Sequence, residues 1–179
     1  EWYAKKFVKK NKLTKFKIDI KKQIRFLLTL LQSKEKVLVH RDFHVSNLMK
    51  YKNKIGVIDS QDALIGNRAY DLASLIDDVR FRTDEIFKNK IYRYYLKLNK
   101  KRVNKATLLS DFEILSILRN MKIIGIFTRL AMRDKKKQYL KLIPYAWKLI
   151  ELRISNNKKF SELKSLLELN FSKKIRNQK

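Results

Sequence analysis

Polar side chains whose types and spacing could do chemistry gather between residues 40 and 60. Asp42 and Asn47 lie five residues apart in the stretch H-R-D-F-H-V-S-N, and Asp59 follows twelve residues after Asn47. Phosphoryl transfer needs such a set, because a carboxylate orients the attacking hydroxyl and accepts its proton while oxygen ligands from Asn and Asp hold Mg²⁺ on the nucleotide phosphates. The segment therefore predicts magnesium-dependent phosphoryl transfer.

These residues also have other interpretations. Asp42 could be only a loop acid, and Asn47 could serve to cap a turn. His40 and His44, the two histidines of the chain, could instead form a metal pair with Asp42 as a third ligand, as in a metallohydrolase. The chain has no further histidine to complete such a site, which favours phosphoryl transfer.

Short strands must position these side chains. The β-branched run at 37–39 predicts one strand, and the alternation of 48–51 and 54–59 predicts a hairpin that turns at residues 52–53. A loop followed by a hairpin can bring the three polar side chains to one edge of a small sheet.

The rest of the chain has helical periodicity. Apolar residues at helical spacing predict an amphipathic helix over 20–31 and a buried central helix over 108–132, which is apolar on more than one face. Further helices are expected around 91–98, 143–154 and 160–170. The fold class is therefore α+β and mostly α.

Particular residues refine the helical prediction. Pro144 is expected to start or kink the helix to which it belongs. Four aromatic residues at helical spacing are expected to pack in the core or half-buried rather than to stack on bases. They are Trp2, Tyr94, Tyr95 and Trp147.

The expected organisation is a single lobe with four parts. A helical lead-in covers residues 1–35, and catalytic and metal-binding loops with short strands cover 36–62. A helical subdomain covers 63–172, and a basic tail over 173–179 is expected to fray.

The motifs resemble those of a known family. H-R-D-F-H-V-S-N-L-M, with I-D-S-Q-D-A and the later A-Y-D-L-A-S-L, resembles the catalytic region of the aminoglycoside phosphotransferase and choline kinase-like family, the small-molecule branch of the kinase-like fold. Within it, the chain looks closest to bacterial kinases that phosphorylate the anomeric hydroxyl of N-acetylmuramate and N-acetylglucosamine. The resemblance implies a kinase that uses ATP and Mg²⁺ on an amino sugar.

The resemblance also implies roles for individual residues. Asp42 would be the catalytic base, and Asn47 and Asp59 would hold Mg²⁺ and, through it, ATP. Arg68 could meet a phosphate or pair with Asp71, and the sequence leaves both open. Further residues would support the loop (His40, Arg41, Asp71) or contact the substrate (Gln61, Asp62, His44), although surface polar residues after a strand are also common.

The chain departs from the family pattern in two ways. Ser60 stands where the family has an aromatic residue after the metal-binding Asp, which is expected to loosen the packing there. Nothing before Val37 has the strands or glycines of an N-terminal kinase lobe, so we expect this chain to be the C-terminal lobe, with the N-lobe supplied by the rest of the protein. A catalytically incomplete kinase-like fragment is an alternative.

The charge of the chain raises another alternative. With 44 Lys and Arg against 17 Asp and Glu, the net charge is +27, as for a basic helical nucleic-acid-binding protein. Residues 40–85 contain seven basic and eight acidic residues, so the excess lies in the flanking helices and is interpreted as AT-rich codon usage rather than a specific nucleic-acid site. The chain has no cysteine and no apolar run of membrane-spanning length, and a cytoplasmic protein is expected.

Overall fold

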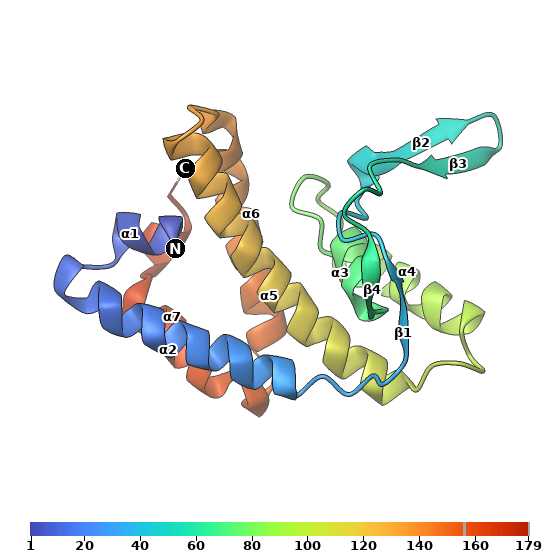
Figure 1. Cartoon of the computed structure of the whole chain (residues 1–179), viewed down its shortest axis with the longest axis horizontal. Helices are drawn as coiled ribbons and strands as arrows, with labels where there is room; N and C mark the ends of the chain where they lie inside the picture. Colours follow the sequence, from blue (N-terminus) through green and yellow to red (C-terminus); the bar gives the residue numbers. More distant parts are fainter. Residues whose placement is uncertain (156, 179) are drawn as a thin grey trace. The chain divides into compact units, whose positions relative to one another are not determined.

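The computed structural model describes residues 1–155 and 157–178, which form short strands among many helices (Figure 1). The strands are β1 (Lys36–Val39), β2 (Leu48–Tyr51), β3 (Lys54–Val57) and β4 (Leu64–Asn67). The α-helices are α1 (Trp2–Phe7), α2 (Lys10–Thr29), α3 (Ala69–Ile76), α4 (Glu85–Leu98), α5 (Lys105–Met132), α6 (Ile143–Ile154), α7 (Ser161–Asn170) and α8 (Lys173–Arg176). Short 3₁₀ helices are η1 (Val45–Asn47), η2 (Lys137–Leu142) and η3 (Lys158–Phe160). The predicted fold class, α+β and mostly helical, is confirmed.

The chain divides into two compact units. We call residues 31–116 the loop unit and residues 1–30, together with those from 117 onward, the helical unit. Within the described residues, no helix combines the length and the apolar character needed to span a bilayer.

Two antiparallel ladders make up the β-structure of the loop unit. β1 pairs with β4, with Lys36 opposite Asn67, and β2 pairs with β3, with Leu48 opposite Val57. Lys52 adopts a φ of 52° in the turn between β2 and β3. The predicted strand at 37–39 and the predicted hairpin are therefore confirmed, although β3 ends at Val57.

β4 was not predicted. Its sequence, L-I-G-N, is four residues long and contains Gly66, so it has neither the length nor the alternation of a recognisable strand. Its partner β1 lies more than twenty residues earlier, so the sequence around β4 itself does not indicate the pairing. The cross-strand pair of Leu38 and Ile65 is exposed.

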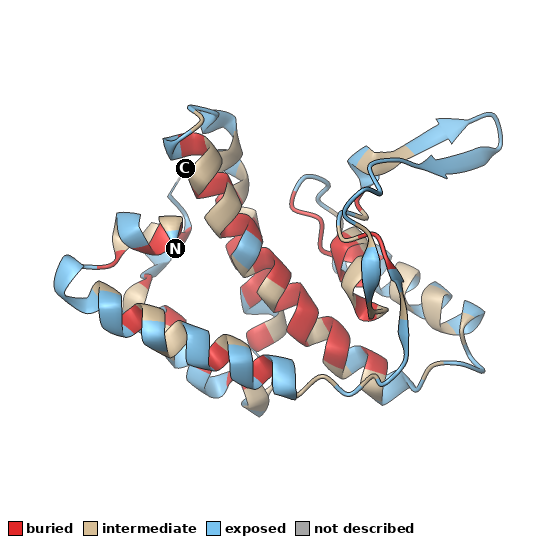
Figure 2. Ribbon diagram, in the orientation of Figure 1, coloured by how far each residue is buried: buried red, intermediate tan, exposed pale blue. Residues whose placement is uncertain are grey.

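The loop unit has a hydrophobic core formed by its helices. α3 turns Ala69, Leu72, Ala73 and Ile76 inward at the spacing of one helix face. They pack against the first half of α5, where Phe112 is 2% exposed. Figure 2 shows these helices with many buried residues and the hairpin of β2 and β3 as mostly exposed.

Aromatic rings hold the helical unit together. Tyr3, Trp147 and Phe171 pack with ring centroids 5.2–5.8 Å apart, and Phe16 meets Phe171 edge-on at 5.4 Å. Pro144 lies in the first turn of α6, as predicted.

The predicted fraying of the tail is wrong for residues 173–176. They form α8, in which the Arg176 side chain is buried and donates to the Phe171 carbonyl at 2.8 Å and to Glu151 at 2.8 Å. The ion pair between Arg176 and Glu151 thus orders a segment whose own sequence, rich in lysine, gives no sign of a helix. Residue 179 of the predicted tail lies outside the described residues.

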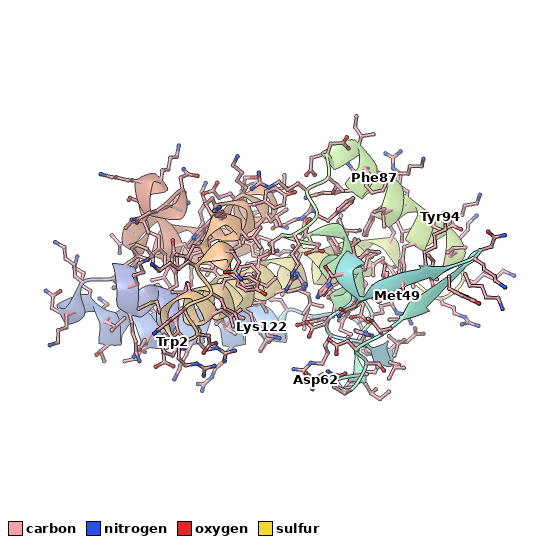
Figure 3. All side chains as sticks on the ribbon, turned by 90° about the horizontal axis from the view of Figure 1, so that it is seen from above. Trp2, Met49, Asp62, Phe87, Tyr94 and Lys122 are labelled. Carbon is pink, nitrogen blue, oxygen red and sulfur yellow. The ribbon has the colours of Figure 1, made fainter. Side chains whose placement is uncertain are left out.

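The packing predicted for the aromatic residues holds except at Tyr94. Trp147 is buried, and Trp2 and Tyr95 are half-buried. Tyr94 is 62% exposed because α4 turns its other face to the core, and its side chain is labelled in Figure 3.

Candidate active site

Asp71 holds the loop that follows β1. Its carboxylate accepts the backbone N–H of His40 at 2.7 Å and that of Arg41 at 3.0 Å. Arg41 has a φ of 74°, a left-handed conformation that costs about 1–2 kcal/mol for a side chain of this kind. Hydrogen bonds to a charged acceptor contribute about 1.5–3 kcal/mol each, so the Asp71 contacts offset this cost.

Asn47 connects the two halves of the site. Its side-chain Nδ2 donates to the Asp42 carbonyl at 2.9 Å, and its own carbonyl accepts the N–H of Ile58 at 3.1 Å. Ile58 directly precedes Asp59. The loop that carries Asp42 and the turn that carries Asp59 are therefore joined through one residue.

The orientation of the Asn47 amide follows from its hydrogen bond. Only Nδ2 can donate to the Asp42 carbonyl, so Oδ1 is left as an acceptor. Asp59 supplies a carboxylate from a turn with a φ of 69°, and its Oδ1 accepts from Gln61 Nε2 at 2.8 Å. An amide oxygen and a carboxylate are the oxygen donors that Mg²⁺ prefers.

His40 lies beneath the same turn. Its Nε2 is 2.9 Å from the carbonyl of Ile58, and a carbonyl only accepts, so Nε2 carries the proton. The ring is 9% exposed. His40 therefore braces the residue before Asp59, while the Asp42 side chain is exposed and makes no hydrogen bond to a described residue.

The residues expected to contact substrate fall into two groups. Gln61 and Asp62 are exposed beside Asp59, and the Asp62 carbonyl accepts from Arg41 Nη1 at 3.4 Å. His44 is 8% exposed, and its backbone N–H donates to the Asp42 carbonyl at 3.0 Å. His44 is thus buried, and its contact with substrate stays a prediction.

Sequence reasoning missed a buried carboxylate that organises the loop unit. Asp111 of α5 is fully buried and accepts the backbone N–H groups of Gln32 and Ser33, at 2.8 and 2.9 Å, and Nδ2 of Asn67 at 2.6 Å. The partners lie 44 to 79 residues away, so no spacing motif marks them. Arg68, for which a phosphate or Asp71 was considered, pairs with Glu35.

The metallohydrolase alternative finds no support. Among the described residues, no group of three or more His, Asp or Glu side chains is placed to hold a metal ion. His40, His44 and Asp42 therefore do not form such a site.

Comparisons with known proteins identify the family of the chain. A family model described as "Phosphotransferase enzyme family" matches residues 6–119. The chain is 35% identical over 149 residues to the N-acetylmuramate/N-acetylglucosamine kinase of Neisseria meningitidis serogroup B, across 80% of this chain and 45% of that protein. It is 32% identical over 137 residues to the kinase of the same name from Pseudomonas aeruginosa, across 74% and 40% of the two chains.

The chain thus spans less than half the length of these relatives. The family match extends over well more than half of the chain and includes the loop from His40 to Asp59, together with Asp71 and Asp111. On this evidence the chain belongs to the phosphotransferase enzyme family.

Proposed function

We propose that this protein is an ATP-dependent phosphotransferase that phosphorylates a hydroxyl group of an amino sugar. The observation that carries the proposal is the hydrogen-bonded connection of Asp42, Asn47 and Ile58, which sets a carboxylate and two magnesium-type donors around one loop. The exposed Asp42 carboxylate orients the acceptor hydroxyl and takes its proton.

The donor set fits Mg²⁺. Asn47 Oδ1 and the Asp59 carboxylate would hold the ion, and bound Mg²⁺ would neutralise charge on the transferred phosphate. Asp71 and His40 would not contact the ion. Asp71 holds the backbone before Asp42, and His40 holds the carbonyl of Ile58, the residue before Asp59.

We also propose that the chain is the C-terminal lobe and that the rest of the protein supplies a nucleotide-covering lobe. The hairpin supports this, because all eight residues of β2 and β3 are half-buried or exposed. Met49 is 55% exposed, Tyr51 71% and Ile55 62%. Apolar surface of this kind is typical of a contact with another part of a protein, and Met49 is labelled on the hairpin in Figure 3.

The amino-sugar substrate rests on the relatives. The matched proteins are named as kinases of N-acetylmuramate and N-acetylglucosamine, and this chain, which is 31–35% identical to three of them, is proposed to act on the same class of sugar. A cytoplasmic location is part of the proposal, because ATP would be its co-substrate.

Replacing the base tests the mechanism in the full-length protein. Asp42→Asn removes the proton acceptor but keeps the shape of the side chain, so we expect loss of at least about 100-fold in kcat with an unchanged melting temperature. The measurement is transfer of labelled phosphate from ATP to N-acetylmuramate or N-acetylglucosamine.

A matched control makes the same chemical change away from the loop. Glu168→Gln, at an exposed position of α7, should retain parental turnover. Undiminished turnover in Asp42→Asn would contradict the assignment of the base, and no phosphorylation of either sugar by the parent would contradict the substrate class.

A further inference from the structure

The helical unit contains a cavity that the phosphotransfer loop does not use. Its volume is about 490 Å³, within the range of about 300–1,000 Å³ typical of small-molecule sites. α1, α2 and the second half of α5 form its walls, with single residues from α6 and α7. The walls are mostly apolar and include Trp2, Phe16, Ile20, Ile24, Met121 and Trp147.

Gly125 opens this cavity from the middle of α5. Glycine is among the poorest helix formers, and a glycine inside a 28-residue helix usually has a packing reason. Here a Cβ atom added to Gly125 would meet nothing within 4 Å. No neighbour therefore requires glycine, and the missing side chain leaves space where Gly125 lines the cavity.

Two cations of α5 lie on either side of that glycine. Lys122 and Arg129 both line the cavity and are seven residues apart, which places them on one face of the helix about two turns from each other. Arg129 Nε is buried and has no hydrogen-bond partner among the described residues. Figure 3 labels Lys122 and Trp2, which line the cavity from α5 and α1 respectively.

The acidic group at the cavity is already engaged. Glu1 lies 3.0 Å from the ammonium group of Lys5, and among the described residues it forms no ion pair with Arg129 or Lys122. The site thus combines an apolar interior with two cationic side chains of α5, and a buried Arg129 Nε–H group without a hydrogen-bond partner costs free energy. An anionic group with an apolar body satisfies both features.

We propose that this cavity is a binding site for a small amphipathic carboxylate. The apolar body would lie against Trp2, Ile20 and Trp147, over the space left by Gly125. The carboxylate would accept hydrogen bonds from Arg129 and Lys122. The cavity lies wholly within the helical unit, so the proposal is independent of the proposed phosphotransfer.

Calorimetric titration of the full chain with decanoate tests the site, with decanol and decylamine as neutral and cationic analogues of equal length. We expect decanoate to bind at least about tenfold more tightly than either analogue. Equal affinity for decanol would overturn the proposed role of the cations.

Gly125→Leu separates this site from general anion binding by a basic protein. The leucine would occupy the part of the cavity next to α5 and is a better helix former, so decanoate affinity should fall at least about tenfold while the melting temperature stays equal or rises. Ser165→Leu, at an exposed position of α7, is the matched control and should bind as the parent does. Parental affinity in Gly125→Leu would overturn the site.

Arg129→Gln provides a second variant that does not depend on how α5 repacks. It removes the charge but keeps much of the stem, so decanoate should lose about tenfold in affinity and decanol should be unaffected. Equal losses for both molecules would contradict a contact between Arg129 and the carboxylate.

Discussion

Ser60 stands where the resemblance of the motifs led us to expect an aromatic residue. It lies directly after Asp59 and borders a cavity of about 290 Å³. Leu38, Phe43 and Val57 contribute apolar walls, and His40 and Asp71, which hold the loop, also line this space. The loosened packing expected beside Asp59 therefore corresponds to an open space next to the groups that position the site.

Filling this space should stabilise the loop unit. We predict that Ser60→Phe raises the free energy of unfolding by about 1 kcal/mol, because a phenyl ring would bury apolar area against Leu38 and Val57. Urea denaturation followed by circular dichroism measures the change. Ser165→Phe, on an exposed face of α7, is the control and should not stabilise. A destabilised Ser60→Phe would show that the backbone at this turn cannot admit the ring.

At the scale of elements, sequence patterns predicted those helices and strands that are stabilised mainly by residues close to one another in the chain. The hairpin of β2 and β3 and the central helix were predictable because their alternation and periodicity lie within one segment. β4 and α8 were not, since β4 depends on pairing with β1 and α8 depends on Arg176 reaching Glu151. Propensity is overridden where a distant partner supplies the energy.

In the candidate site, too, the local spacing of residues was predictable and the long-range contacts were not. The spacing of Asp42, Asn47 and Asp59 is visible in the sequence, and in the structure Asn47 hydrogen-bonds to Asp42 and to the residue before Asp59. What fixes the loop in place is not visible there. Asp71 meets the loop across about thirty residues, and Asp111 joins α5 to the segment before β1.

Asp111 should be the most sensitive joint between these elements. We predict that Asp111→Ala lowers the free energy of unfolding by about 3–5 kcal/mol, because it removes three hydrogen bonds to a buried carboxylate, from Gln32, Ser33 and Asn67. Denaturant unfolding gives the value. Hydrogen exchange should show faster exchange in β1, which follows the freed segment.

Asp84→Ala is the matched control for that loss. Asp84 caps α4 by accepting the N–H of Phe87 at 2.7 Å at an exposed position, so its removal should cost only about 1 kcal/mol. Equal losses from the two substitutions would mean that Asp111 is not a junction of the loop unit.

For the whole molecule, two tyrosine hydroxyl groups make the stability of the fold depend on pH in the alkaline range. Burial raises the pKa of Tyr92 to about 12, with the Glu113 carboxylate as a second cause. Burial also raises the pKa of Tyr3 to about 12, although the Trp147 hydrogen bond and the Arg176 charge act in the opposite direction. An unfolded tyrosine ionises near pH 10. The native state therefore keeps protons that the unfolded state releases.

The sign of the pH dependence follows from these pKa values. Stability from the two phenols is fully present below about pH 10 and is lost progressively as the pH rises toward 12, because the unfolded state binds fewer protons in that window.

We predict that Tyr92→Phe flattens this decline without loss at pH 7, since the Tyr92 hydroxyl is buried without a hydrogen-bond partner among the described residues. Tyr3→Phe should flatten it too but lose about 1 kcal/mol at pH 7, because Trp147 Nε1 and the Ile175 carbonyl lose their partner. Thermal unfolding from pH 8 to 12 measures both slopes, and Tyr94→Phe, at an exposed position, controls for the titration of the many lysines. An unchanged slope in both buried-site variants would assign the alkaline loss to lysine deprotonation instead.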